Sequence, residues 1–212
     1  RIHRDKYMAK GEPMPVCIVV GTDPLSFLTS STEAPEGMCE LDMMGAYRGE
    51  AIECVIGKHT GLPFPANSEI VIEGFIHPGN TALEGPFGEW LGYQGAEMEA
   101  EPWVDISAVY HRNDPIMLGA AHIRMPYEYA RYRAISRSAV LKENIARAGV
   151  PDVDNVWAHE VGGSRLFLAI GITQRYPGHS KQAGLIASQC HAGAYANRWV
   201  IVVDDDIDPA NL

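Results

Sequence analysis

The chain has 212 residues and a formal net charge of −10 at pH 7, and 46% of its residues are hydrophobic. The acidic balance argues against a nucleic-acid partner, because neutralising phosphates requires clustered Lys and Arg. No apolar run reaches the roughly 18–20 residues that span a bilayer. We therefore expect a globular protein of one large or two small domains, with no membrane span.

The first part of the chain is predicted to be rich in strands. The β-branched run at 15–21 indicates a buried strand, and EIVIEGFI at 69–76 alternates apolar and acidic residues as a half-buried strand does. Other strands are expected at 52–56 and 103–110. Two short helices are expected at 23–28 and 41–47. Short strands joined by Gly- and Pro-rich turns are typical of a barrel or sandwich.

The pattern changes at Pro126 and becomes helical as far as residue 148. In this helix Tyr132, Ile135 and Ala139 share one face, and Leu141 and Ile145 lie four residues apart. Strands at 153–157 and 165–172, a helix opening at Pro177 and a strand at 199–203 follow. The small residues of the second helix permit close packing, at positions Ala183, Ala187, Cys190 and Ala194. This order of elements describes an α/β unit.

Four cysteines are scattered through the chain without a CxxC pair, at Cys17, Cys39, Cys54 and Cys190. This usage favours buried free thiols in a reducing, cytoplasmic compartment. The chain begins at Arg1 rather than Met and stops shortly after the acidic run at 204–208. Both ends therefore look truncated, and we expect a larger protein.

The segment EGPFGE carries two carboxylates five residues apart, Glu84 and Glu89. Between them, glycine at 85 and 88 permits backbone conformations that other residues resist, and Pro86 restricts one. A turn of this composition can bring both acids to one cleft. Such a pair can separate its pKa values and perform general acid–base catalysis. The alternative is a surface turn with two solvated glutamates.

The EGPFGE segment, placed after the EIVIEG strand, resembles a signature of the UbiD family of reversible decarboxylases. Further stretches agree with the family and occur in its order: SSTEAPEGMCELDMMGA, LPFPANSEIVIEG, YHRNDPI, QRYPGHSKQAG and WVIVVDDDID. The resemblance implies an α+β protein, with a split β-barrel domain that binds prenylated FMN over residues 1–125. A smaller α/β domain for oligomerisation is implied over residues 126–212.

The same resemblance implies the chemistry. The implied substrate is an aromatic or α,β-unsaturated acid, and the implied assembly is a homo-oligomer, either a dimer or a hexamer. Glu84 and Glu89 match the catalytic glutamates, with Glu89 preferred as the proton donor and Glu84 holding the network. Glu40 matches the ligand to Mn2+ or Mg2+, and Ser30 and Ser31 match a loop beside the flavin phosphate, where K+ is also implied. Without the family, Glu40 would be interpreted as the exposed side of a helix start.

Two departures from the family stand out. A lysine that contacts the flavin phosphate in some members falls near Ala192, so His191 or an arginine elsewhere is needed instead. Arg133 replaces an apolar residue of the substrate pocket, and it is either a solvated helix arginine or a partner for a second anionic group on the substrate.

The family's bridging arginine and two further metal ligands, an asparagine and a histidine, belong to sequence that precedes Arg1. Two other hypotheses therefore stay open. The chain alone is an inert scaffold or assembly fragment, or it is an FMN reductase, since split barrels also host those.

Overall fold

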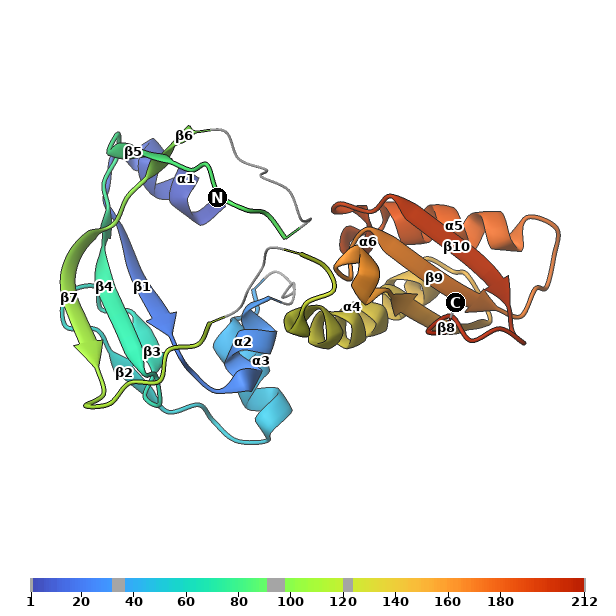
Figure 1. Cartoon of the computed structure of the whole chain (residues 1–212), viewed down its shortest axis with the longest axis horizontal. Helices are drawn as coiled ribbons and strands as arrows, with labels where there is room; N and C mark the ends of the chain where they lie inside the picture. Colours follow the sequence, from blue (N-terminus) through green and yellow to red (C-terminus); the bar gives the residue numbers. More distant parts are fainter. Residues whose placement is uncertain (1, 32–36, 91–97, 120–123, 212) are drawn as a thin grey trace. The chain divides into compact units, whose positions relative to one another are not determined.

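The computed structural model describes residues 2–31, 37–90, 98–119 and 124–211. The chain forms two units, each described here by itself (Figure 1). The first unit comprises Arg1–Ser30, Ala34–Phe87 and Gln94–Gly119. The second unit comprises Ser31–Glu33, Gly88–Tyr93 and Ala120–Leu212.

An antiparallel sheet of three strands forms the centre of the first unit, in the order β1 (Met14–Val20), β4 (Ile70–Ile76) and β7 (Asp105–His111) (Figure 1). The central strand β4 pairs with β1 on one side and with β7 on the other. Two shorter antiparallel ladders accompany this sheet. They pair β2 (Cys54–Ile56) with β3 (Pro63–Pro65), and β5 (Thr81–Glu84) with β6 (Glu99–Pro102).

In the described part of the first unit the helices are α1 (Ile2–Lys10), α2 (Pro24–Ser30) and α3 (Glu40–Arg48). Helices α2 and α3 pack against each other, and the Ser26 hydroxyl on α2 donates to the sulfur of the buried Met44 on α3, at 2.8 Å. The turn from β1 into α2 requires glycine. Gly21 has a φ of +69°, and a Cβ there would lie 2.5 Å from the carbonyl oxygen of Ile116.

The second unit is a three-stranded sheet with helices. Its strands are β8 (Val153–Ala158), β9 (Phe167–Ile172) and β10 (Trp199–Asp204). Strand β9 is central, antiparallel to β8 and parallel to β10. Its helices are α4 (Glu128–Arg147), the 3-10 turn η1 (Glu160–Gly162), α5 (His179–Gln189) and α6 (His191–Ala194).

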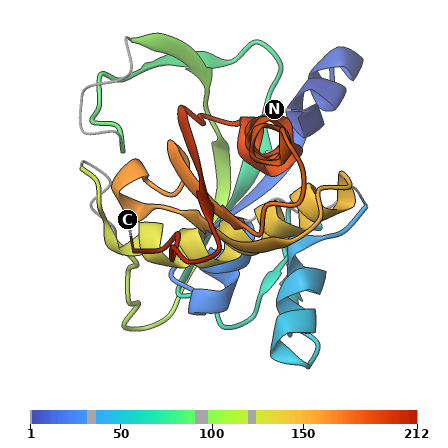
Figure 2. The same cartoon turned by 90° about the vertical axis from the view of Figure 1, so that its right-hand side faces the viewer.

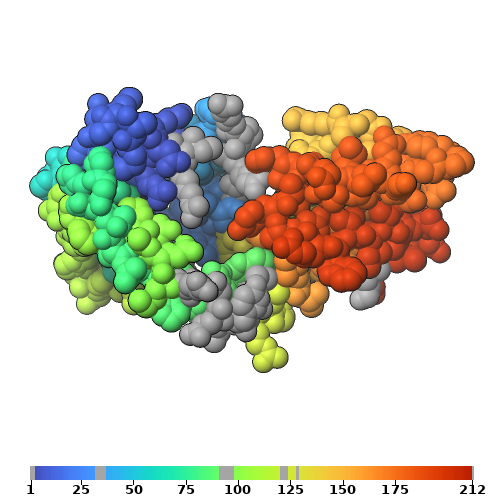
Figure 3. Space-filling model, turned by 90° about the horizontal axis from the view of Figure 1, so that it is seen from above, coloured from blue at the N-terminus to red at the C-terminus, as the bar shows by residue number. Residues whose placement is uncertain are grey.

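The core of the second unit lies between one face of this sheet and helices α4 and α5. Leu141 and Ile145 of α4 are fully buried, as are Ala183 and Ala187 of α5. They pack with the sheet residues Val156, Ala158, Leu168, Ile170 and Ile172. In Figure 2 the chain is turned so that α5 is seen nearly end-on. Figure 3 shows the atoms of helices and strands α4 to β10 in yellow to red.

The predicted order of helix, strand, strand, helix and strand is confirmed by α4, β8, β9, α5 and β10. The mixed fold with several small sheets is also confirmed, whereas the closure of the first unit into a split barrel stays a prediction. No helix among the residues that the structure describes is long and apolar enough to cross a bilayer.

The prediction that the cysteines are buried was wrong for two of them. All four are free as expected, but Cys39 and Cys54 are exposed thiols. Tyr132 and Ile135 share one face of α4 and are 61% and 57% exposed, so the core side of this helix is formed by other residues, among them Leu141 and Ile145.

Candidate functional site

A cavity of about 370 Å³ lies where strand β1 ends against helices α2 and α3. Ser30, the last residue of α2, and Glu40, the first residue of α3, both line it. Its apolar lining comes from Val19, Val20, Phe27, Leu41, Met44 and Leu118. The fold therefore brings one predicted flavin-phosphate residue and the predicted metal ligand, ten residues apart in sequence, to one hollow of the first unit.

Hydroxyl groups form the polar side of this cavity. The Thr22 hydroxyl donates to that of Ser26 at 3.2 Å, and both residues line the cavity. The Ser30 hydroxyl donates to the carbonyl of Phe27 at 2.9 Å, which leaves its oxygen able to accept. The volume falls within the range of small-molecule sites, and the mixture of apolar walls and a few oxygen atoms is typical of them.

The donor set suits one part of a hard-cation site. Glu40 offers a carboxylate at the start of a helix, and hydroxyl and carboxylate oxygens are the ligands that Mg2+ and Mn2+ prefer. No group of three or more His, Cys, Asp or Glu side chains that could hold a metal occurs within the described part of the chain. Glu40 therefore fits a metal as one ligand among several.

The two predicted catalytic glutamates stand at the ends of one short loop. Glu84 is the last residue of β5 and is exposed, and it lies opposite Glu99 in the backbone register of the β5–β6 ladder. Glu89 is half-buried. Gly85 between them has a φ of +90°, as the glycine-rich turn predicted. Because Glu84 belongs to the first unit and Glu89 to the second, their meeting at one pocket stays a prediction.

The residue after Glu89 fixes this part of the loop to the second unit. Trp90 packs over Gly163, where a Cβ would lie 2.2 Å from ring carbon Cζ3 of Trp90. Gly163 has a φ of +60°, so both its backbone and its neighbour exclude a side chain. Ser31, the remaining predicted site residue, is half-buried and also belongs to the second unit.

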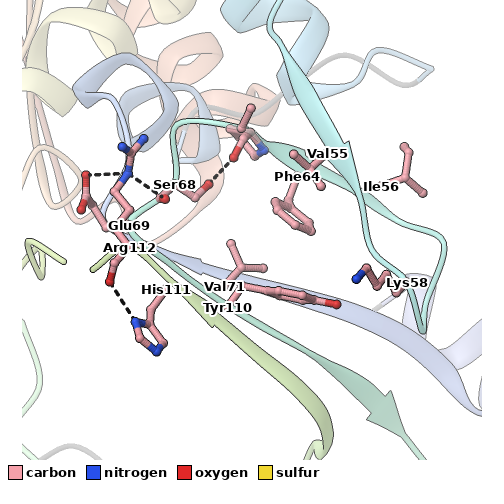
Figure 4. A pocket seen from close by; sticks show the side chains of 12 residues that line it. Val55, Ile56, Lys58, Phe64, Ser68, Glu69, Val71, Tyr110, His111 and Arg112 are labelled. Atoms are coloured by element: carbon pink, nitrogen blue, oxygen red, sulfur yellow. Dashed lines mark hydrogen bonds and ion pairs between the residues drawn. The ribbon is translucent and has the colours of Figure 1, made fainter. Parts of the chain in front are cut away.

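A second cavity of the first unit, of about 410 Å³, lies between the β2–β3 ladder and strands β4 and β7 (Figure 4). Phe64, Val71 and Tyr110 are among its lining residues, together with Lys58. Glu69, at its edge, pairs with Arg112 at 3.3 Å, so that arginine is already neutralised. None of the predicted site residues lines this cavity.

Beside it lies a buried carboxylate that sequence reasoning missed. Glu73 is fully buried, and its Oε1 accepts hydrogen bonds from the backbone N–H groups of His59 (2.8 Å) and Thr60 (2.5 Å) and from the Thr60 hydroxyl (2.7 Å). Oε2 accepts from the Tyr110 hydroxyl at 2.7 Å. Burial alone would raise the pKa of Glu73, but the hydrogen bonds from Thr60, Tyr110 and His59 lower it to about 2.

The alternation of EIVIEGFI had suggested that its acidic residues face solvent, and for Glu73 this is wrong. The hydrogen bond to Glu73 and burial in turn raise the pKa of Tyr110. The network joins strand β4, strand β7 and the loop at 57–62. It is a structural centre of the first unit, and neither Glu73 nor Tyr110 changes its protonation state near neutral pH.

Comparison with known proteins agrees with these observations over nearly the whole chain. Residues 1–125 match the family model described as the 3-octaprenyl-4-hydroxybenzoate carboxy-lyase Rift-related domain. Residues 132–212 match the C-terminal domain of the same carboxy-lyase. The chain belongs to the UbiD family. The resemblance predicted from the sequence motifs is thereby confirmed.

Solved structures of UbiD-class enzymes are similar to this member throughout its length. An evolved dimeric form of HmfF from Pelotomaculum thermopropionicum, in complex with prFMN, is 31% identical with a TM-score of 0.84 over 98% of this chain. Vanillic acid decarboxylase of Sedimentibacter hydroxybenzoicus in its open form is 29% identical, with a TM-score of 0.81 over 99%. The 3,4-dihydroxybenzoic acid decarboxylase AroY of Klebsiella pneumoniae is 29% identical, with a TM-score of 0.82 over 98%.

This UbiD-family chain spans under half the length of those structures, at 47%, 45% and 44% of the three.

Proposed function

We propose that the protein to which this chain belongs is a non-oxidative, reversible decarboxylase of aromatic or α,β-unsaturated carboxylic acids, dependent on prenylated FMN. The observation that carries the proposal is the cavity shared by Ser30 and Glu40, in a chain that matches the UbiD family over both of its units. The similar structures include a prFMN complex and two decarboxylases of aromatic acids, which supports the same class of reaction.

Residues 1–125 form the flavin-binding domain in this proposal, as a split β-barrel. Ser30 and Ser31 hold the phosphate end of the flavin, with K+ nearby, and Glu40 is one ligand of the Mn2+ or Mg2+ that joins that phosphate. The hydroxyl and carboxylate oxygens suit these partners. When bound, the prenylated flavin supplies the electron sink for the loss of CO2.

The carboxylates of the EGPFGE loop manage the proton. Glu89 delivers a proton to the substrate carbon that has lost CO2, and takes it back in the carboxylation direction. Glu84 orients Glu89 and its surroundings. The half-burial of Glu89 supports this division, because a partly enclosed side chain is better placed to meet a bound substrate than the exposed Glu84.

Residues 126–212 form the oligomerisation domain in this proposal, and the partner is a second copy of the chain, in a dimer or hexamer. The face of the β8–β9–β10 sheet opposite the helices supports it. Trp199 of β10 is 70% exposed there, Val161 of η1 is 64% exposed, and both line a largely apolar hollow of about 410 Å³. Apolar surface of this kind is typical of subunit interfaces. The four free cysteines fit a cytoplasmic location.

The test is decarboxylation by the full-length protein reconstituted with prenylated FMN and Mn2+. We expect CO2 release from an aryl acid, and hydrogen–deuterium exchange at the same carbon of the product. Glu89→Gln should lower both rates by at least about a hundredfold while flavin stays bound. Bleaching of FMN by NADH without CO2 release supports a reductase instead, and normal turnover by Glu89→Gln refutes the assigned role.

A further inference from the structure

Two exposed cysteines of the first unit line one hollow. Cys39 immediately precedes helix α3, and Cys54 is the first residue of strand β2. Both are free thiols that are exposed to solvent. Both line a hollow of about 750 Å³ beside α3, and we call them the cysteine pair.

The path of the chain explains why these two residues share a hollow. After helix α3, the chain turns on Gly49, which has a left-handed backbone. The segment that follows lies against the helix at Gly45, where a Cβ would be 3.2 Å from the carbonyl oxygen of Glu50 and 3.9 Å from Cγ1 of Ile52. The returning segment therefore runs beside α3.

The lengths of the two segments bring the thiols towards each other. Cys39 comes six residues before Gly45, which is about 9 Å along a helix axis. Cys54 comes two residues after Ile52, which is about 7 Å along an extended chain. A segment that runs back along α3 from Gly45 thus reaches the neighbourhood of the start of the helix, where Cys39 lies.

The two thiols also influence each other electrostatically. Partial burial raises the pKa of the Cys54 thiol, and the charge of Cys39 raises it further. Charges that are exposed to solvent act on each other over roughly 10 Å. This interaction agrees with the shared hollow and indicates that the two sulfurs are neighbours.

The other two cysteines differ from the pair in exposure. Cys17 and Cys190 are half-buried. Their sulfurs contact the Thr60 hydroxyl at 3.5 Å and the Ala187 carbonyl oxygen at 3.6 Å, respectively. Accessible thiols react with oxidants more readily than enclosed ones. Oxidation is therefore expected at the cysteine pair first.

We propose that Cys39 and Cys54 are a redox-active pair, which a small disulfide such as oxidised glutathione converts to a protein disulfide. The thiolate of one cysteine attacks a sulfur of the oxidant, so that a mixed disulfide forms and one glutathione leaves. The other cysteine then attacks the mixed disulfide and releases the second glutathione. One S–S bond forms in the protein and one breaks in the oxidant, and the protons of the two cysteines pass to the two glutathiones.

The new bond would act on the neighbouring Glu40. A disulfide requires Cα atoms about 4.4–6.8 Å apart, so its formation closes the hollow and draws the first turn of α3 towards β2. Glu40 follows Cys39 directly and lines the other cavity together with Ser30. The same movement would withdraw the Glu40 carboxylate from that cavity. This consequence rests on the proposed function, in which Glu40 is a metal ligand, whereas the bond itself does not.

The first measurement needs neither metal nor flavin. The full-length protein is incubated with oxidised or reduced glutathione, free thiols are blocked with N-ethylmaleimide, and disulfides are mapped by mass spectrometry. Cleavage after glutamate separates Cys17, Cys39 and Cys54, because Glu33 and Glu53 lie between them. We expect a disulfide that joins the Cys39 and Cys54 peptides. Alkylation of both thiols should fall at least about tenfold and recover with a phosphine reductant.

Two results of this measurement would overturn the inference. One is that both thiols stay free in oxidised glutathione. The other is that each carries its own glutathione and no cross-link forms, because two neighbouring cysteines would resolve such an adduct.

Variants separate the pair from ordinary thiol oxidation. In Cys39→Ser the remaining Cys54 has no partner, so it should accumulate as a glutathione adduct, and Cys54→Ser should leave Cys39 in the same state. Cys17→Ser is the matched control, because this half-buried thiol belongs to the same unit but lies on β1. It should cross-link as the wild type does. Loss of the cross-link in Cys17→Ser would contradict the assignment of the pair.

The second measurement follows the metal in the FMN-loaded full-length protein. Oxidation should lower bound Mn2+ at least about fivefold by electron paramagnetic resonance, and the reductant should restore it. Cys39→Ser should retain Mn2+ under both conditions. A cross-link without a change in bound Mn2+ refutes the action on Glu40. Reduced protein that binds no Mn2+ but still forms the cross-link supports the cysteine pair and refutes the proposed metal site.

Discussion

The hydroxyl of Tyr110 on β7 donates a hydrogen bond of 2.7 Å to the buried carboxylate of Glu73 on the adjacent strand β4. Three further donors from the loop at 57–62 saturate the other carboxylate oxygen. A buried charge is tolerated only when it is hydrogen-bonded in this way. The interaction therefore ties the loop beneath the second cavity to the central sheet.

Glu73→Leu should lower the free energy of unfolding by about 3 kcal/mol, because it leaves four N–H and O–H donors without their acceptor. Urea denaturation followed by fluorescence measures the change. Glu53→Leu, at an exposed position of the same unit, should change stability by no more than about 0.5 kcal/mol. Equal effects of the two substitutions would contradict the role of Glu73.

The same carboxylate predicts a pH dependence. The pKa of Glu73 is about 2 in the folded chain and near 4.5 when unfolded, so the unfolded state binds the extra proton. Its contribution to stability is complete above about pH 5 and is lost as the pH falls towards 2. Measured between pH 7 and pH 3, the stability gap between wild type and Glu73→Gln should therefore narrow with falling pH. Parallel curves would show that the carboxylate is not stabilised as described.

Apolar, β-branched runs were located well from the sequence because burial alone defines them. The run at 15–21 became β1 (Met14–Val20), and the helical pattern at 126–148 became α4 (Glu128–Arg147). Strands β5 and β6 were missed, because β5 is exposed throughout and neither has an apolar pattern. These two strands form because they pair with each other, which the local sequence does not show. The short β3 was missed too, because two of its three residues are prolines, which local patterns do not assign to strands.

The face of α4 that is buried could not be chosen by counting apolar residues. Tyr132 and Ile135 are exposed, while the polar Ser138 is buried because its hydroxyl accepts the N–H of Ala158 at 2.9 Å. That partner lies twenty residues away and has no local signature. Glu73 was misjudged for the same reason, since Thr60 and Tyr110 come from other parts of the chain.

The residues of the candidate site were predicted from family motifs, and the structure adds which of them share a cavity and which neighbours they contact. Ser30 and Glu40 meet at one cavity, which periodicity alone did not indicate. The contact of Trp90 with Gly163 was missed, because a glycine in a turn signals backbone freedom and not the ring that lies over it. Such close approaches depend on segments that are about seventy residues apart.

Gly163→Ala should destabilise the second unit by about 2 kcal/mol or more and displace Trp90. The new Cβ would meet Cζ3 of Trp90 at 2.2 Å and the sulfur of Met125 at 2.6 Å. Gly149→Ala is the matched control, because Gly149 also has a positive φ (+84°) but nothing within 4 Å. That variant should cost only about 1 kcal/mol, from backbone strain. Thermal unfolding compares them, and similar losses would show that the ring contact has no energetic weight.

Glu40→Ala should weaken Mn2+ retention by the FMN-loaded full-length protein at least about tenfold, because it removes a charged oxygen ligand from the cavity that Ser30 also lines. Asp42→Ala is the control. Asp42 stands in the same first turn of α3, with the same effect on the helix dipole, but it does not line that cavity. Bound manganese is measured by electron paramagnetic resonance after gel filtration. If the two variants retain equal amounts, Glu40 acts only through the charge of the helix start, and the cavity does not hold the metal through this residue.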